Sequence, residues 1–390
     1  MRCAIGLFLL ALCTACDATR ISELADSGAS GSGGTGADNS DASVSGGNAG
    51  TPGDLVDAGE PILSDAASAG APGVGDAAVV ADSGEVDGAM GDASATYEDG
   101  DTLPWRPLQV TAPPADYAFT FQPSDADPEA VQQDGNQVGR LDTRVTPLGK
   151  LVVDMGARGG SNMAWFPRRG FHFMAVDFMG VGEVPSVVGR GADFYGDVRL
   201  EALTGEDRVT DIAVSFHDSF EGHVTYGLAY LHSQFPDQDW GYYLNQDGSV
   251  RWSDVIVTGS SHGASSTARF AKVRRLWRAV SRSGPRDNTC GEDPECTDGV
   301  VATWFSEESQ TPIDRYFSIS GTADGQFPEI QYALQAIGYV GMPVNVEDVP
   351  PPYEGSRRLI SYADHMGFCN EGAQWDDACN YMFGVPPENQ

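Results

Sequence analysis

The stretch "VIVTGSSHGASSTARFAK", residues 255–272, decides the fold. An apolar run typical of a buried strand ends at a glycine, and a run of helix formers starts a few residues later. Ser261 lies between them, with Gly259 and Gly263 each two positions away. A nucleophilic serine needs this placement, because a sharp strand-to-helix turn lifts its hydroxyl clear of the sheet and requires small flanking residues. The pattern predicts a nucleophile at Ser261, with an ordinary turn serine in a chain of 48 glycines as the alternative.

The surrounding segments decide between these two interpretations, since a lone Gly-x-Ser-x-Gly is a weak signal. Short apolar runs, which predict buried strands, alternate with longer amphipathic segments, which predict helices. The predicted strands are residues 150–156, 171–178, 254–259, 276–284, 315–321 and 357–363. The predicted helices are 207–235, with a candidate break at Gly222, and 327–339. This alternation predicts an α/β fold with a mostly parallel sheet and helices on both faces. Residues 181–207 do not fit the alternation and are a candidate lid or pocket wall.

Three regions of the chain differ in composition. Residues 1–16 carry a positive charge at Arg2 and then "AIGLFLLAL", an apolar run typical of an export signal and too short to span a bilayer. Residues 17–105 consist mostly of Gly, Ala, Ser, Asp, Pro and Val, which predicts a disordered tether. Aromatic residues recur from "TLPWRPLQV" onward, so residues 106–390 are the predicted folded domain.

The small residues before Cys16, in "LCTAC", resemble a bacterial lipoprotein signal, in which the cysteine receives a lipid. The third residue before such a cysteine is usually Leu, whereas this chain has Cys13 there. We expect a lipid at Cys16 and export to the outer membrane or cell surface, with the lipid as the sole membrane contact. A plain secretory signal, giving a secreted or periplasmic protein, is the alternative.

Charge and cysteine content narrow the function further. The net charge of −33 argues against a nucleic-acid partner, because phosphate binding requires clustered Lys and Arg. An even number of cysteines in the folded part of an exported chain predicts two disulfides. These cysteines are Cys290, Cys296, Cys369 and Cys379. Three pairings are possible, and we favour Cys290–Cys296 with Cys369–Cys379 because it closes two short loops. These four cysteines have no CxxC spacing that would support a zinc site instead.

The stretch "DVIVTGSSHGASSTA" resembles the nucleophile elbow of the α/β-hydrolase superfamily. The resemblance extends over about residues 115–383, in the order of predicted strands and helices, and is greatest to secreted bacterial enzymes of esterase or lipase type. It implies an α/β-hydrolase fold, a Ser-acid-His order of catalytic residues, and no cofactor or metal.

The resemblance places the catalytic histidine after the last predicted strand, where "SYADHMGFCNE" contains His365. It places the acid after the preceding strand, where "SISGTADGQF" contains Asp324. Asp287, in "SRSGPRDN", is the alternative acid, and Asp364 is adjacent to His365 and would point away from it. His172 lies within a predicted strand and is expected in the core.

An oxyanion hole requires two hydrogen-bond donors. By the same resemblance, the His262 amide is one, and the loop "GARGGSN", residues 156–162, supplies the other from Ala157 or Arg158. The expected function is ester hydrolysis by a serine hydrolase through an acyl-enzyme, acting on a small-molecule or lipid ester. A catalytically silent binding or display protein on this fold, or a peptidase or acyltransferase, is the alternative. The oligomeric state is not readable from the sequence.

Overall fold

The computed structural model describes residues 107–131, 135–155, 163–178, 190–289, 299–365, 368–369 and 373–390, all within one compact unit, Ala93–Gln390. Several predictions fall outside these residues: the export signal, the lipid at Cys16, the tether, the donors Ala157 and Arg158, and the Cys290–Cys296 pair. No helix in the described part of the chain is long and apolar enough to cross a membrane.

Within these residues the chain forms a nine-stranded sheet of order β1-β2-β4-β3-β5-β6-β7-β9-β8. The strands are β1 (Asp116–Phe121), β2 (Gln137–Asp142), β3 (Leu151–Met155), β4 (His172–Val176), β5 (Val255–Ser260), β6 (Arg278–Arg282), β7 (Tyr316–Gly321), β8 (Val344–Asn345) and β9 (Arg358–Ser361). β2 is antiparallel to β1 and β4, and all other pairs are parallel. The predicted mostly parallel sheet is confirmed.

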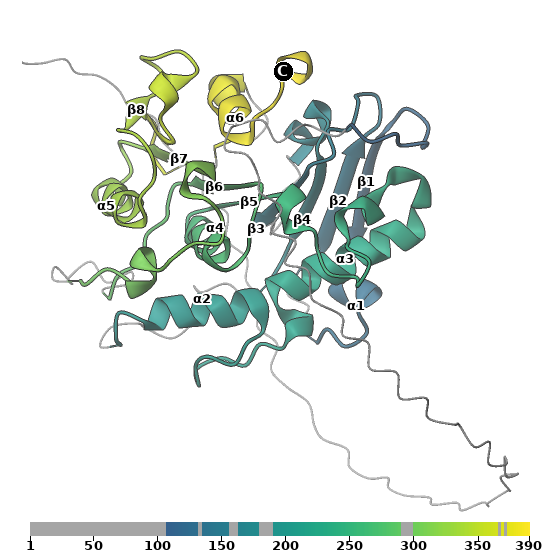
Figure 1. Ribbon diagram of the computed structural model, residues 1–390, viewed down its shortest axis with the longest axis horizontal. Helices are drawn as coiled ribbons and strands as arrows, with labels where there is room; N and C mark the ends of the chain where they lie inside the picture. Colours follow the sequence, from purple (N-terminus) through teal and green to yellow (C-terminus); the bar gives the residue numbers. More distant parts are fainter. Residues whose placement is uncertain are drawn as a thin grey trace, which may run out of the picture. The chain divides into compact units, whose positions relative to one another are not determined.

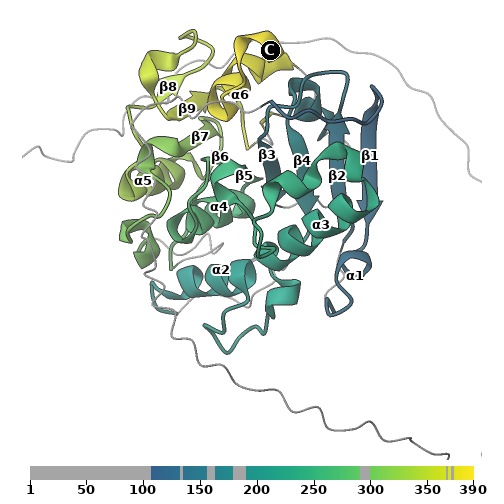
Figure 2. The same cartoon turned by 45° about the vertical axis from the view of Figure 1, so that its right-hand side comes forward.

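Helices cover both faces of the sheet, as predicted (Figure 1). The helices are α1 (Pro123–Ala126), α2 (Phe194–Thr204), α3 (Phe220–Gln234), α4 (His262–Val273), α5 (Phe327–Ile337) and α6 (Asp376–Phe383). Successive strand residues point to opposite faces, so Val153 packs in the core that includes α3, α4 and α5, whereas Val152 packs in the core that includes α6. In Figure 2, α3 lies across β2 and β4.

Two helices before β5 differ from what the sequence predicted. Residues 194–204, part of the candidate lid, form helix α2, which packs against α3 and α4. The helix predicted over 207–235 begins only at Phe220 and passes Gly222 without a break. A Cβ at Gly222 would lie 1.8 Å from the Phe216 carbonyl oxygen, so glycine is needed here for close approach of the chain and not to interrupt the helix.

His172 is fully buried in β4, as predicted for a core residue. Its Nε2 lies 2.8 Å from the Gln238 carbonyl oxygen and its Nδ1 lies 3.0 Å from the Tyr243 hydroxyl. A neutral ring with its proton on Nε2 satisfies both contacts, since Nε2 donates to the carbonyl and Nδ1 accepts from the hydroxyl. Burial lowers the pKa of His172 to about 4.

This pKa makes the stability of the fold depend on pH. Between pH 6.5 and about pH 4 the unfolded chain binds a proton at this position that the folded state excludes. Stability therefore falls as the pH decreases through this window, by about 3 kcal/mol from this residue. We expect urea unfolding at several pH values to show a smaller decrease for His172→Gln than for the unchanged protein. His232→Gln, an exposed control, should keep the original slope; an equal slope in both variants would contradict the assignment.

Candidate active site

Ser261 occupies the turn between β5 and α4. β5 ends at Ser260 and α4 begins at His262, so Ser261 alone connects the strand to the helix. Its backbone has φ 56° and ψ −119°. A non-glycine residue in this region costs about 1–3 kcal/mol and is typical of functional turns.

Both glycines of the motif are required by close approach of the backbone. A Cβ on Gly259 would lie 2.5 Å from the carbonyl carbon of Gly263. A Cβ on Gly263 would lie 2.6 Å from the carbonyl oxygen of Met155, the last residue of β3. Any side chain at either position would therefore push the strand and helix apart. The strand–turn–helix that the motif predicted is present.

Asp324 and His365 lie together although 41 residues separate them in the chain. Asp324 follows β7 and His365 follows β9, which is the neighbour of β7 in the sheet. His365 Nδ1 lies 2.6 Å from Asp324 Oδ2. A proton on Nδ1 shared with a carboxylate leaves Nε2 as the basic nitrogen of the neutral ring.

The carboxylate of Asp324 is held rigidly, and the histidine ring is accessible. The Asp324 side chain is 3% exposed, and its Oδ1 accepts a 2.8 Å hydrogen bond from the Gln326 amide. The His365 side chain is 37% exposed. Asp364 accepts the backbone N–H of His365 at 2.7 Å, whereas the His365 ring contacts Asp324. A buried carboxylate that orients an accessible imidazole is the arrangement required for a general base.

Ser261 lies at the same edge of the sheet as this pair. β5, β6, β7 and β9 are consecutive parallel neighbours, so their carboxyl ends meet at one edge. The Ser261 amide donates to the Arg282 carbonyl at the end of β6, at 2.9 Å. Ser261 and His365 are both among the described residues, and no hydrogen bond joins the Ser261 hydroxyl to the His365 ring. Such contacts are often long before a substrate binds.

Asp287, the alternative acid, forms a buried ion pair with Arg199. Its two carboxylate oxygens receive hydrogen bonds from Arg199 Nε and Nη2, at 2.7 and 2.6 Å, and one also accepts from Trp304 Nε1 at 3.0 Å. Both side chains of the ion pair are almost fully buried. Arg199 Nη1 also donates to the His262 carbonyl at 3.1 Å. The pair therefore ties helix α2 to the first turn of α4.

Asp287→Asn is expected to destabilise the fold, and its activity tests whether Asp287 is the catalytic acid. Removing one partner of a buried ion pair typically lowers stability by about 3–5 kcal/mol, because the remaining charge stays buried. The midpoint of urea unfolding measures this loss. Variant protein that remains folded should hydrolyse esters within about tenfold of the original rate. A loss of about 10⁴-fold in folded Asp287→Asn would instead make Asp287 the catalytic acid.

The structure describes His262 of the expected oxyanion donors, whereas Ala157 and Arg158 lie outside the described residues. His262 is the first residue of α4, so its amide belongs to a helix N-terminus, where backbone N–H groups and the helix dipole favour negative charge. Met155, beside Gly263, is the last described residue before the loop of Ala157 and Arg158.

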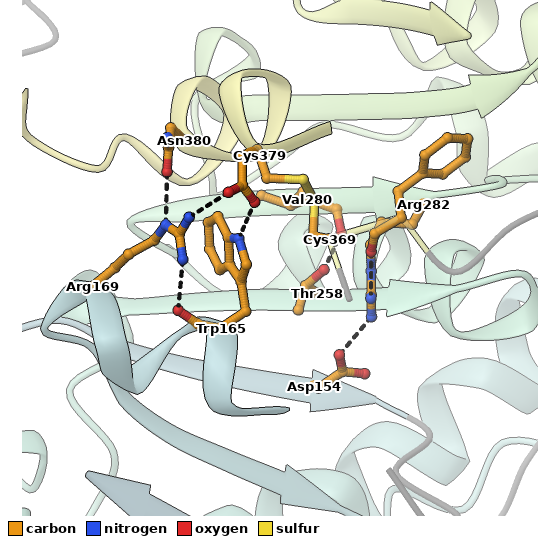
Figure 3. Close-up of a disulfide and its surroundings, with 11 residues drawn as sticks. Asp154, Trp165, Arg169, Thr258, Val280, Arg282, Cys369, Cys379 and Asn380 are labelled. Carbon is orange, nitrogen blue, oxygen red and sulfur yellow. Dashed lines mark hydrogen bonds and ion pairs between the residues drawn. A yellow bond between two sulfur atoms is a disulfide. The ribbon is translucent and has the colours of Figure 1, made fainter. Parts of the chain in front are cut away.

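A disulfide joins Cys369 to Cys379, as predicted, with the two Cα atoms 5.6 Å apart. It connects the segment just after His365 to helix α6 (Figure 3).

Two further histidines have structural contacts. His217 Nδ1 lies 2.7 Å from Asp127 Oδ2, and His223 Nδ1 lies 2.6 Å from the Asp177 carbonyl oxygen. Among the described residues, no group of three or more His, Cys, Asp or Glu side chains is placed to hold a metal ion.

A cavity of about 730 Å³ lies between the segment after β6, residues 299–301 and α5. Its walls include Arg286, Asn288, Val300, Phe305, Glu329 and Tyr332. The Arg286 amide donates to Ser265 Oγ at 2.8 Å, on the first turn of α4. The cavity wall is thus joined to the helix that begins beside Ser261. Ser261, Asp324 and His365 are not among the residues that line the cavity.

Arg199 is the residue of this region that the sequence did not point to. Its role depends on helix α2, which the apolar pattern of residues 181–207 did not predict. In the segment "DVRLEAL", residues 197–203, Arg199 and Glu201 alternate with apolar residues, which is typical of a strand and not of a helix. In the structure, residues 198–203 are all buried in α2.

The sheet order, with the serine turn after the central β5 and the acid and histidine after β7 and β9, defines an α/β-hydrolase fold. No protein-family description matches the sequence. No curated protein matches it either.

Several solved structures are similar to the chain. One is S-formylglutathione hydrolase FrmB of Staphylococcus aureus, at 14% identity and a TM-score of 0.35, over 70% of this chain and 97% of that one. FphF, fluorophosphonate-binding serine hydrolase F of the same organism, has 16% identity and a TM-score of 0.35, over 70% and 98%. Thermogutta terrifontis esterase 2 phosphonylated by cyclosarin has 15% identity and a TM-score of 0.35, over 70% of this chain and 92% of that one. At such identities residue roles do not transfer between proteins.

Proposed function

We propose that this protein is a serine hydrolase that cleaves carboxylic esters, with Ser261 as nucleophile, His365 as general base and Asp324 as the orienting acid. The observation that carries the proposal is the 2.6 Å contact between His365 and the buried Asp324, at the sheet edge where Ser261 occupies a strained turn. Although separated in sequence, these three residue types lie at one edge of the sheet, and their chain order of Ser, Asp and His is typical of the α/β-hydrolase fold.

The proposed reaction proceeds through an acyl-enzyme. Ser261 Oγ attacks the ester carbonyl carbon while His365 Nε2 takes the hydroxyl proton, and Asp324 stabilises the resulting imidazolium. Backbone amides, that of His262 among them, stabilise the tetrahedral oxyanion. The intermediate collapses, and His365 returns the proton to the leaving alcohol. Water then attacks the acyl-enzyme with the same base, which releases the acid and restores Ser261.

The setting of this chemistry is also a proposal. Residues 1–16 would direct export and a lipid on Cys16 would anchor the chain to a bacterial membrane, with residues 17–105 as the tether. The domain spans residues 106–390. The cavity beside α5 would receive one part of a small-molecule or lipid ester.

A panel of acyl donors and acceptors tests the proposal. The full chain is incubated with p-nitrophenyl esters of graded acyl length, with the matching anilides, and with esters plus added alcohols. We expect hydrolysis of the esters, much slower cleavage of the anilides, and the free acid as main product in the presence of alcohol. Faster anilide cleavage would indicate a peptidase, and ester products an acyltransferase. Turnover of no substrate would indicate a binding protein.

A further inference from the structure

We propose that Arg282 is a positioning residue for the reaction, which holds the segment of His365 in place relative to Ser261. The inference rests on the function proposed above. Arg282 is the last residue of β6 and touches three segments that meet at the reacting edge of the sheet. Its carbonyl accepts the Ser261 amide at 2.9 Å. Its Nη1 donates to the Phe368 carbonyl at 3.0 Å, and its Nη2 pairs with Asp154 of β3.

The sheet register explains how one side chain reaches both partners. Arg282 lies two residues after Val280, so its side chain projects to the face covered by α6. Asp154 of β3 pairs directly with Thr258 of β5, and its side chain is on the same face as that of Val152. The guanidinium therefore crosses β5, where Thr258 is small and hydrogen-bonds the Val280 carbonyl. Figure 3 shows the guanidinium between Asp154 and the segment of Cys369.

Burial makes this contact rigid. The Arg282 and Asp154 side chains are each 4% exposed, so water does not compete for their hydrogen bonds. Burial raises the pKa of the Asp154 carboxyl, and the Arg282 charge opposes that rise. A guanidinium presents donors in two directions in a fixed plane, whereas an ammonium group is a point charge on a flexible stem. Lysine could therefore pair with Asp154 but would not hold Phe368 at the same time.

The contact at Phe368 restrains the segment that follows His365. Phe368 is three residues after His365 and is fully buried, and Cys369 beside it is bonded to α6. The segment is therefore tied to α6 on one side and to the end of β6 on the other. Because the Arg282 carbonyl also accepts the Ser261 amide, Arg282 links the segment that follows the base to the turn of the nucleophile. Misplacement of a catalytic group by 1 Å lowers a rate by about 10²-fold.

Steady-state kinetics of Arg282→Lys in the full chain tests the inference. We expect kcat for a p-nitrophenyl ester to fall about 10- to 100-fold, with KM within about two-fold, in protein that remains folded. Arg278→Lys is the matched control, since Arg278 lies on the same strand and donates to the Tyr381 and Met382 carbonyls of α6. It should keep kcat within about two-fold.

Further measurements separate positioning from stability and from a failure of the proposed function. Millimolar guanidinium should restore part of kcat in Arg282→Ala and none in Arg278→Ala. Unchanged kcat in Arg282→Lys, or an equal loss in Arg278→Lys, would overturn the inference. If Arg282→Lys does not fold, Asp154→Asn/Arg282→Gln is measured instead, and an unfolded double variant would also overturn it. Absence of fluorophosphonate labelling in the unchanged protein would reject the hydrolase itself; wild-type labelling rates in Arg282→Lys would reject only the positioning role.

Discussion

Ser261→Ala is expected to lower kcat/KM for ester substrates by about 10⁴-fold or more while leaving the fold intact. The hydroxyl is the only group removed, and in the proposed mechanism its oxygen forms the covalent bond to the substrate. The backbone should keep its turn, because the hydrogen bonds of Ser261 to Arg282 and Ala264 use main-chain atoms. Residual catalysis by the oxyanion donors and substrate binding would set the remaining rate.

The neighbouring residue provides the control for this prediction. Ser260 is also partly buried and belongs to the end of β5, so Ser260→Ala tests the loss of a hydroxyl at the same edge. We expect it to keep kcat/KM within about tenfold. Hydrolysis by Ser261→Ala at the rate of Ser260→Ala, with equal thermal unfolding midpoints, would contradict the assignment of the nucleophile.

Asp324→Asn is expected to lower kcat by about 10⁴-fold, because an amide favours the wrong ring tautomer and does not stabilise the imidazolium. The substitution keeps the shape of the side chain, and its amide oxygen can still accept from the Gln326 amide, as Asp324 Oδ1 does. Steady-state hydrolysis of a p-nitrophenyl ester measures the loss.

Asp364→Asn is the matched control for Asp324→Asn. Asp364 is exposed and adjacent to His365, and its carboxylate accepts the backbone N–H of that residue. We expect it to change kcat by less than about tenfold. A loss in Asp364→Asn as large as in Asp324→Asn would show that the orienting carboxylate has been misassigned.

The central strands were predictable because each is buried on both faces and reads as a continuous apolar run. β3 and β5, with "LVV" and "VIV", are examples. β1 and β2 escaped prediction because polar residues interrupt their apolar pattern: β1 is an edge strand with half of its residues exposed. α2 escaped because it has no polar face. Its Glu201 is buried and accepts the amides of Arg208 and Val209, each at 2.9 Å.

The candidate site likewise contains residues that the sequence identified and residues that it did not. Ser261 carried a local signal, since the glycines around it are required by contacts within one strand–turn–helix. Asp324 and His365 were identified by their places after successive predicted strands. Arg199 and Arg282 were not identified, because their partners, Asp287 and Asp154, are 88 and 128 residues away in the chain. Nothing in the residues near a buried arginine specifies which distant carboxylate will neutralise it.

The central claim is that His365 and Asp324 activate the hydroxyl of Ser261. Mass spectrometry of peptides from the full chain, after reaction with a fluorophosphonate, tests it most directly. We predict one adduct on the peptide that contains Ser261, formed far more slowly in His365→Ala and Asp324→Asn and absent in Ser261→Ala. An adduct on another residue, no adduct at all, or an adduct at Ser261 that forms equally fast without the imidazole would contradict the account.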